Sequence, residues 1–455
     1  MNRHFAFFKQ ALLTTVFSSS ILVAMLFSIP CTVGAQETNE SSEWSQWLGN
    51  HRDSVWKDDE IMDSFPEDGP QLVWRAPVAL GYAGPAVARG KVYIADYVRS
   101  DGDTTPDAAK KSELTGQERI TCFDANTGEQ LWQHSYDCAY KLSYPGGPRA
   151  TPTVNQGHVY ALGAEGNLLC LDADDGKVVW EKDLKAEYKL DLAPHWGFAA
   201  HPLVDGNTLY CLVGGEGSVA VAYDKNTGEE KWRALSSKEQ GYCPPTMIKT
   251  GNIKQLLIWH PESLNSLNPE NGEVNWSFDM KPAFNMSIIA PVKHGDFLYA
   301  TALRGTSILL KLGNDSATAE EVWRGKGLHP DHNPPLIVDG HIYGMDERGQ
   351  IRCFEMESGE QLWETLAAST GKRPVSSATG FIVKNGDRYF IANEQGELIM
   401  AKMSPTEFEE IGRFKMLEPT NQTGSRDVVW SHPAFANQCV YARNDEEIVC
   451  YSLAK

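Results

Sequence analysis

The sequence predicts an all-β protein that folds as a single eight-bladed β-propeller with four-stranded antiparallel blades. Three observations predict it. A short phrase with an acid, a glycine and a tryptophan recurs along the 455 residues, and its tryptophans return every 40 to 52 residues. Most units also contain a tight-turn dipeptide such as Asp205-Gly206 and a proline near the first strand, which are signals for hairpins and strand starts. A period of 40–50 residues with short strands is typical of propellers, and seven blades is the alternative count.

The repeated phrase keeps fixed offsets of four and eight residues. It occurs as Asp124/Gly128/Trp132, Asp172/Gly176/Trp180, Asp224/Gly228/Trp232, Asn268/Gly272/Trp276 and Glu355/Gly359/Trp363, while Asp315 and Trp323 keep the outer pair around Ala319. The first residue can accept backbone N–H bonds, and the glycine can adopt φ > 0 in the bend. We expect each tryptophan to lay its ring on the next unit, with its indole N–H free to find an acceptor.

The units number eight, and the last is incomplete. They start near Ala83, Arg149, Ala200, Cys243, Ile289, Asn333, Ser377 and His432. The seventh lacks the tryptophan, and the eighth ends without a fourth strand. Residues 71–77 supply one, with Trp74 as its repeat tryptophan. We therefore predict a ring closed by an N-terminal strand, which leaves no exposed sheet edge.

The N-terminal 35 residues have the features of a secretory signal peptide. Arg3 and Lys9 precede an apolar run, and Val33-Gly34-Ala35 is a small-residue cleavage site. The alternative is an uncleaved anchor, since the run is long enough to span a membrane. Pro30 before Cys31 argues against lipidation. We divide the chain into a signal peptide (1–35), a packed N-terminal arm (36–70) and the propeller (71–455), and expect export to the periplasm or beyond.

The net charge and the cysteines indicate which partners and which cysteine pairings to expect. The net charge is -19, and loss of Arg3 and Lys9 with the signal leaves 39 basic and 60 acidic residues, or -21. This disfavours a nucleic-acid partner, because phosphates require neutralising Lys and Arg. We expect no transmembrane segment after cleavage and a monomeric protein. Eight cysteines remain in an oxidising compartment, and Cys439 and Cys450, which flank a predicted hairpin, are a candidate disulfide. Cys122, Cys170 and Cys353 recur at one repeat position as buried packing residues.

The phrase Asp-x-x-Thr-Gly-x-x-x-Trp, complete at Asp124–Trp132 and Asp224–Trp232, resembles the pyrroloquinoline-quinone (PQQ) repeat throughout residues 71–455. The segment from Trp44 to Asp53 is similar to the leader of many secreted bacterial members. The resemblance implies a PQQ-like propeller, closer to the non-catalytic accessory propellers of outer-membrane barrel assembly than to the quinoprotein alcohol dehydrogenases. The adjacent cysteine pair and the Ca²⁺-ligand set of those dehydrogenases are not traceable here, and neither is a haem-attachment motif.

Two kinds of connection in each blade should lie on the same face, at the mouth of the channel. They are the loops that enter the first strands and the turns that join the second strands to the third. Ten residues map there as candidate ligand-binding residues: His195, Trp196, His201, Trp259, His260, His329, Asp331, His332, Trp430 and His432. Aromatic rings offer apolar area and histidines offer directional hydrogen bonds. Solvated or packed loop residues are the plainer interpretation. Arg149, Arg304 and Arg348 interrupt a rim of glutamates, and residues 98–117 are expected to form a mobile loop on this face.

We therefore expect a non-catalytic binding scaffold of the cell envelope, which holds an envelope protein or peptide at the channel mouth. The alternative is a PQQ-dependent alcohol dehydrogenase with PQQ and Ca²⁺ across the mouth, and sugar binding through the rim tryptophans is a third possibility. No catalytic residue is assigned. No metal site is expected either, because His329 and His332 lie three residues apart without a compact ligand set.

Overall fold

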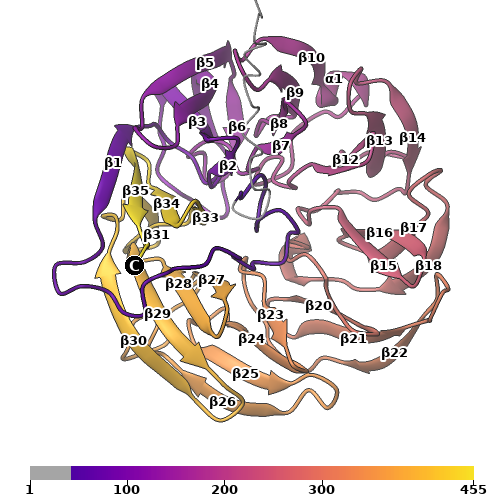
Figure 1. Ribbon diagram of the computed structural model, residues 1–455. Coiled ribbons are helices and arrows are strands. Elements are labelled where there is room, and N and C mark those ends of the chain that lie inside the picture. Colours follow the sequence, from indigo (N-terminus) through magenta and orange to yellow (C-terminus); the bar gives the residue numbers. More distant parts are fainter. Residues whose placement is uncertain (1–42) are drawn as a thin grey trace, which may run out of the picture. The chain divides into compact units, whose positions relative to one another are not determined.

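The computed structural model describes residues 43–455, so the predicted signal peptide lies outside the described residues. Eight four-stranded antiparallel blades form a ring (Figure 1). The first four are β2–β5 (Ala86–Ala88, Lys91–Gly102, Ser112–Asp124, Gln130–Asp137), β7–β10 (Thr153–Asn155, His158–Leu162, Asn167–Asp172, Val178–Asp183), β11–β14 (Leu203–Asp205, Thr208–Leu212, Ala220–Asp224, Glu230–Ala234) and β15–β18 (Thr246–Thr250, Ile253–His260, Ser263–Leu267, Val274–Asp279).

The remaining blades are β19–β22 (Val292–His294, Phe297–Ala302, Thr306–Leu312, Ala319–Arg324), β23–β26 (Leu336–Val338, His341–Met345, Ile351–Glu355, Gln361–Thr365), β27–β30 (Gly380–Asn385, Arg388–Asn393, Glu397–Met403, Phe408–Lys415) and β33–β35 (Ala434–Ala436, Cys439–Arg443, Glu447–Ser452). The last blade is completed by β1 (Leu72–Pro77), which pairs with β35. The prediction of eight blades closed by an N-terminal strand is confirmed.

Helix is almost absent, and the extra strands lie outside the blade pattern. Helix α1 spans Leu184–Glu187, and the 3-10 turn η2 spans Ala283–Asn285. Strand β6 (Tyr140–Leu142) adds to the first blade, while β31 (Asn421–Thr423) and β32 (Arg426–Val428) form a separate hairpin. Within residues 43–455, none of the helical segments has the length and hydropathy to cross a membrane.

The repeat tryptophans join neighbouring blades as expected. Six of the seven donate their indole N–H to a backbone carbonyl of the next blade, over 2.8 to 3.2 Å: Trp74, Trp132, Trp180, Trp232, Trp323 and Trp363. The ring also lies against the repeat glycine of that blade, as Trp132 does against Gly176. Trp276 is the exception, and the blade that follows it has Ala319 in place of the glycine. Its N–H instead reaches Gln255 of its own blade.

A β-bulge accompanies every fourth strand. In each of the eight blades, the register shifts by one residue where the third strand meets the fourth, and the extra residue directly precedes the tryptophan position. A bulge increases local twist and re-aims the following side chain. Cysteines stand opposite four of the seven tryptophans: Cys122, Cys170, Cys353 and Cys450 each pair with one.

The cysteine pair has a more specific environment than the sequence indicated. Cys450 lies between Trp74 on one neighbouring strand and Tyr441 on the other. Cys439 is diagonal to it, and the two thiols share a hydrogen bond. All eight described cysteines are free thiols in the structure. A Cys439–Cys450 disulfide stays a prediction.

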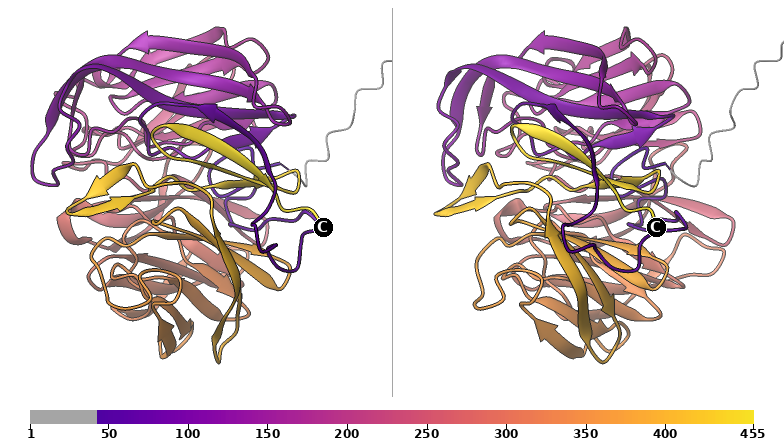
Figure 2. Two further views of the ribbon diagram at one scale, coloured as in Figure 1. Left: turned by 90° about the vertical axis from the view of Figure 1, so that its left-hand side faces the viewer. Right: turned by 60° about the vertical axis from the view of Figure 1, so that its left-hand side comes forward.

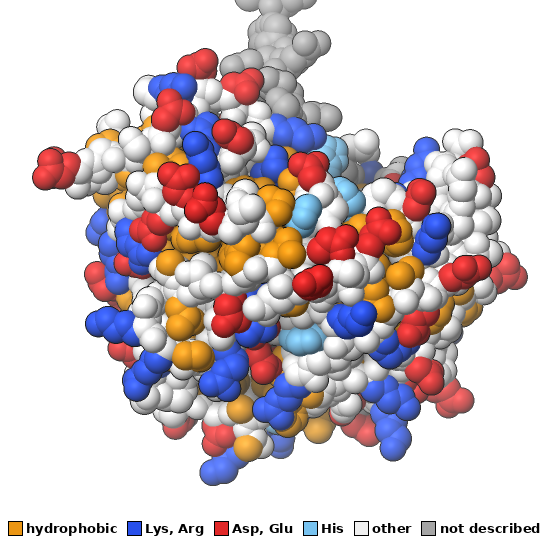
Figure 3. Space-filling model, turned by 90° about the horizontal axis from the view of Figure 1, so that it is seen from below, with side chains coloured by type: hydrophobic (Ala, Val, Ile, Leu, Met, Phe, Trp, Pro, Cys, Tyr) orange, Lys and Arg blue, Asp and Glu red, His pale blue; other side chains and the backbone are white. Residues whose placement is uncertain are grey.

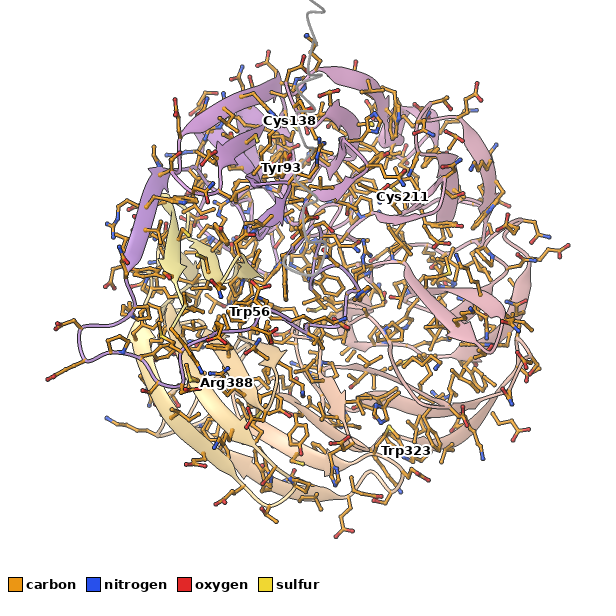
Figure 4. The ribbon with its side chains drawn as sticks, viewed as in Figure 1. Trp56, Tyr93, Cys138, Cys211, Trp323 and Arg388 are labelled. Atoms are coloured by element: carbon orange, nitrogen blue, oxygen red, sulfur yellow. The ribbon has the colours of Figure 1, made fainter. Side chains whose placement is uncertain are left out.

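The segment before β1 crosses the centre of the ring (Figure 1). Trp44 bridges to Val87 on β2, and Val55 bridges in parallel to Lys384 on β27. Three tryptophans of this segment, Trp44, Trp47 and Trp56, are 1%, 6% and 2% exposed. Figure 4 shows Trp56 near the middle of the ring and Trp323 towards its periphery. The segment is thus part of the packed core.

The insertion in the first blade differs from the expected loop. Residues 98–117 were predicted to be a mobile loop, but most of them extend β3 and β4 into a long hairpin, which leaves 103–111 as its tip. Strand β6 pairs with the extension and stabilises it. The backbone of the insertion therefore has ladder partners, which the sequence did not reveal. This hairpin and the β31–β32 hairpin project on the side away from the C-terminus (Figure 2).

Candidate functional site

A large cavity of about 1090 Å³ opens at the mouth of the ring. All eight loops that enter first strands contribute to its lining, from Tyr82 before β2 to Trp430 before β33. The turns β20–β21 and β24–β25 add Arg304 and Arg348, and the tip of the β3–β4 hairpin adds Ala108 and Ala109. The face deduced from blade geometry is therefore where the loops converge.

Seven of the ten candidate residues line this cavity: His195, Trp196, His201, Asp331, His332, Trp430 and His432. The other three do not. Trp259 is fully buried in a blade and donates its indole N–H to the Met280 carbonyl at 3.0 Å. His260 is 4% exposed and contacts Ser263 across a tight turn. His329 lies behind the lining, where its carbonyl accepts the N–H of Glu347.

The reason for the difference is strand length. Strand β16 runs to His260, so Trp259 is a strand residue whose side chain faces the blade interior. The sequence placed it among the loops and turns of the mouth face.

Several lining residues were not identified from the sequence. Six of them are aromatic: Trp47, Tyr82, Tyr144, Tyr242, Phe284 and Phe381. Tyr82 and Tyr144 precede first strands, as His195 and His201 do, so the same positional rule would have found them. Trp47 belongs to the N-terminal segment, and nothing in the repeat pattern places it here.

A network of neutral histidines forms the floor. Trp47 stacks on His201 with ring centroids 4.6 Å apart, and His201 meets His432 edge-on at 5.8 Å. The backbone N–H of Thr151 donates to His201 Nδ1 at 2.8 Å, which fixes that nitrogen as an acceptor. Burial lowers the pKa of His432 to about 3 and lowers the pKa of His201 well below its usual value. Both rings are therefore uncharged at neutral pH.

Arg52 lies below this floor. Its guanidinium donates to the carbonyls of His201, Pro202 and Pro245, at the entrances of two neighbouring first strands. Burial lowers its pKa to about 9. Trp47 and Arg52 thus occupy the middle of the ring, and Trp47 bounds the cavity from that side.

The lining loops hold unusual backbone. Five of their non-glycine residues have positive φ: Tyr144, Phe284, Asn285, Arg304 and Ser377, with φ between 48° and 60°. Each such residue costs free energy that the surrounding fold must supply, and such residues cluster at functional sites. The rim is therefore a built surface and not a set of relaxed turns.

The outer surface is mixed in charge. Figure 3 shows acidic and basic side chains interspersed over one side of the ring, with no continuous basic patch on that face. This distribution is typical of a soluble surface.

The fold and its repeat define a PQQ-like β-propeller. Residues 116–250 and 261–455 match the family model described as outer membrane protein assembly factor BamB. These ranges cover more than half of the chain, which therefore belongs to this family.

Individual relatives are distant. The outer membrane protein assembly factor BamB of Yersinia pestis is 25% identical over 207 residues, which cover 43% of this chain and 48% of the relative. That of Bordetella pertussis (strain Tohama I) is 24% identical over 199 residues, 40% of this chain and 46% of the relative. The chain spans about half the length of the curated relatives it matches.

Solved structures agree on the fold. BamB from Moraxella catarrhalis superposes with a TM-score of 0.56 at 15% identity, covering 84% of this chain and 97% of that one. Quinohemoprotein alcohol dehydrogenase from Comamonas testosteroni gives 0.58 at 13% identity, with 91% and 81% covered. At these identities the likeness concerns the fold alone.

The second of these raises the question of whether PQQ and Ca²⁺ fit here. The carboxylates of the cavity, Glu239, Asp331 and Glu347, come from three separate loops. Across residues 43–455, no group of three or more His, Cys, Asp and Glu side chains is arranged to hold a metal ion. The sequence also has no adjacent cysteine pair. The donor set does not fit, and we derive no reaction step through this cofactor.

Proposed function

We propose that this protein is exported by its N-terminal 35 residues and acts in the cell envelope as a non-catalytic propeller. In this proposal it binds a segment of another envelope protein in the central cavity. The observation that carries the proposal is the convergence of all eight entrance loops on one aromatic cavity, in a chain of the BamB family. The names of its relatives point to outer-membrane protein assembly as the setting.

The shape and lining of the cavity support a peptide ligand. Trp196 packs edge-on against Tyr242, with ring centroids 5.5 Å apart, and Trp430 packs near Tyr82 and Tyr144. Two aromatic groups on different blades can hold apolar side chains, while the polar rim meets a peptide backbone. The indole N–H of Trp430 is buried and has no hydrogen-bond partner among residues 43–455.

The alternative, a PQQ-dependent alcohol dehydrogenase, has less support. Its fold is shared, but fold does not determine chemistry. The ligand set that it requires is not assembled in the cavity, as described above.

Photocrosslinking in intact cells tests the proposal. A photoreactive phenylalanine analogue replaces Phe284, which is 59% exposed on the rim, or Val179, which is 45% exposed on the outer strand β10. We expect a discrete adduct with an envelope protein from position 284 and none from position 179. The adduct should disappear when Trp196→Ala and Trp430→Ala are added. No adduct at 284, or the same adducts at both positions, would contradict the proposal.

A further inference from the structure

The arginines of the rim differ from those elsewhere in the chain. Of the 16 arginines in residues 43–455, 13 place their guanidinium in an ion pair or a hydrogen bond. The three whose guanidinium has neither are Arg304, Arg348 and Arg373. We call these three residues the arginine arc.

The arc lies on one side of the cavity. Arg304 and Arg348 occupy equivalent turns of adjacent blades and line the cavity directly. Arg373 lies in the loop that enters β27. In the same loop, the Val375 N–H donates to the Arg348 carbonyl at 3.1 Å, so the loop is hydrogen-bonded to the turn that carries Arg348. In a protein of net charge -19, Arg304 and Arg348 place two cations without ion pairs in the lining of one cavity.

Arg304, one member of the arc, has a strained backbone conformation. Arg304 has φ of 60°, and its guanidinium lies 4.6 Å from the ring centroid of Phe284, which has φ of 58°. Phe284 is 59% exposed, although it is a large apolar side chain. A cation stacked on an exposed ring forms a surface that can take a carboxylate and an apolar group side by side.

Two nearby acids, Asp331 and Glu347, attract Arg304 electrostatically without forming an ion pair with the arc. Asp331 is 6% exposed, and its carboxylate lies 3.9 Å from His332 Nδ1. Glu347 accepts the backbone N–H of Arg304, and burial raises its pKa. Neither forms an ion pair with an arginine of the arc. Glu239 also lines the cavity, but it belongs to the loop that enters β15.

We propose that the arginine arc makes the cavity selective for an acidic peptide, a segment with Asp or Glu beside an aromatic residue in a partner protein. This inference rests on the proposed function and adds the chemistry of the ligand. A peptide fits better than a nucleic acid, because the surrounding charge repels a polyanion while the arc recognises two or three carboxylates.

Fluorescence anisotropy with two labelled peptides tests this selectivity. Gly-Phe-Asp-Glu-Phe-Gly carries the carboxylates, and Gly-Phe-Asn-Gln-Phe-Gly is its amide match. We expect the full chain to bind the acidic peptide about tenfold more tightly. The substitutions Arg304→Glu and Arg348→Glu together should remove this preference, and Arg304→Gln with Arg348→Gln should weaken it. The matched control, Arg75→Glu with Arg233→Glu, changes two exposed arginines that are ion-paired on outer strands, and should preserve it.

Salt provides a second readout. Recognition by the arc should weaken as salt rises from about 0.05 M to about 0.5 M, because the attraction is screened. General repulsion from an acidic protein would instead be relieved, and binding would strengthen. Equal affinity for both peptides, loss of preference in the control variant, or binding that salt strengthens would overturn the inference. Binding of neither peptide would overturn it too, while the crosslinking experiment decides the proposed function separately.

Discussion

The repeat glycines show how one residue type couples two blades. Gly176 has φ of +71°, and an added Cβ would lie 2.4 Å from Cε3 of Trp132. No side chain fits between this turn and the indole ring. The glycine is therefore required twice, once by the bend and once by the contact.

We predict that Gly176→Ala lowers the free energy of unfolding by about 3 kcal/mol, from backbone strain and overpacking together. Gly206→Ala is the matched control, because Gly206 has φ of +58° with nothing within 4 Å of its added Cβ. It should lose about 1 kcal/mol, the strain alone. Urea titration of both variants measures the difference, and equal losses would show that the tryptophan contact is unimportant.

The buried histidines make stability depend on pH. Burial lowers the pKa of His432 to about 3 in the folded protein, while the unfolded chain titrates near pH 6.5. Between these values the unfolded state binds more protons, so stability falls as pH decreases. The contribution is complete above about pH 6.5 and is lost progressively below it.

We therefore expect His432→Gln to reduce the loss of stability between about pH 6 and pH 4.5 by up to about 1.4 kcal/mol per pH unit. Denaturant titration at several pH values measures the slope. The wild-type protein supplies the reference, since its carboxylates titrate in both proteins. An unchanged slope would show that His432 is protonated in the folded state.

At the scale of elements, the N-terminal segment completes the ring in two places. It fills the centre with Trp47 and Arg52, as described above. It also covers the defective seventh blade: Gly412 stands opposite Met400, where other blades have the tryptophan. An added Cβ on Gly412 would lie 3.7 Å from Phe65, and Phe65 packs edge-on against Phe414 at 4.9 Å. A residue from the segment thus covers the position where the tryptophan is missing.

Further along the segment, Arg388 on β28 donates to the carbonyls of Ile61 and Met62. Figure 4 shows Arg388 below Trp56 in the same sector of the ring. These bonds, together with the bridges of Trp44 and Val55, satisfy much of the backbone of a segment that has no regular secondary structure.

Arg52→Ala should lower the free energy of unfolding by about 2 to 3 kcal/mol, because it leaves buried carbonyls without a donor. Arg233→Ala, which removes an exposed ion pair on β14, should cost under about 1 kcal/mol. Thermal and urea unfolding of the two variants compare them. A loss no larger than that of the control would mean that water replaces the guanidinium at the centre of the ring.

At the scale of the whole molecule, closure by β1 places the first and the last strand of the propeller in one blade. Strand β35 pairs with β34 on one side and with β1 on the other. No blade edge near the ends remains unpaired, which protects the sheet from edge-to-edge association. Six of the eight blade junctions contain the same hydrogen bond from a tryptophan to the next blade, so most of the ring is held by a repeated interface.

The cavity of this ring should not take PQQ. We expect the midpoint of thermal unfolding to be unchanged by PQQ with Ca²⁺, and also by Ca²⁺ alone. A ligand that binds the native state raises the midpoint by mass action, so the measurement reports binding without assuming turnover. A rise that requires both additions would contradict the non-catalytic proposal and favour the dehydrogenase.

Much of the fold was predictable from the sequence because its determinants are local. The offsets between Asp124, Gly128 and Trp132 encode a turn and a contact within nine residues, and repetition makes the pattern visible. The count of eight and the closing strand follow from the same phrase. The face of the loops also follows, because strand order fixes which connections share one side.

The composition of the cavity was predicted only in part. His201 and His432 lie where their position before a first strand indicated, but Trp259 does not, because the length of β16 depends on its pairing with β17. The paired hairpin of residues 98–117 likewise depends on β6, a strand that follows later in the chain.

By itself, the sequence determined the all-β class, the eight units, their closure by residues 71–77 and the face on which the loops gather. Only the tertiary structure decided that Trp47 and Arg52 occupy the centre of the ring, that Phe65 covers the glycine of the seventh blade, and that the guanidinium groups of the arginine arc form no ion pair or hydrogen bond. The physical reason is range. The repeat consists of residues at short, fixed offsets. The contacts of Trp47, Arg52 and Phe65 instead join residues more than 100 positions apart, whose proximity depends on the whole ring.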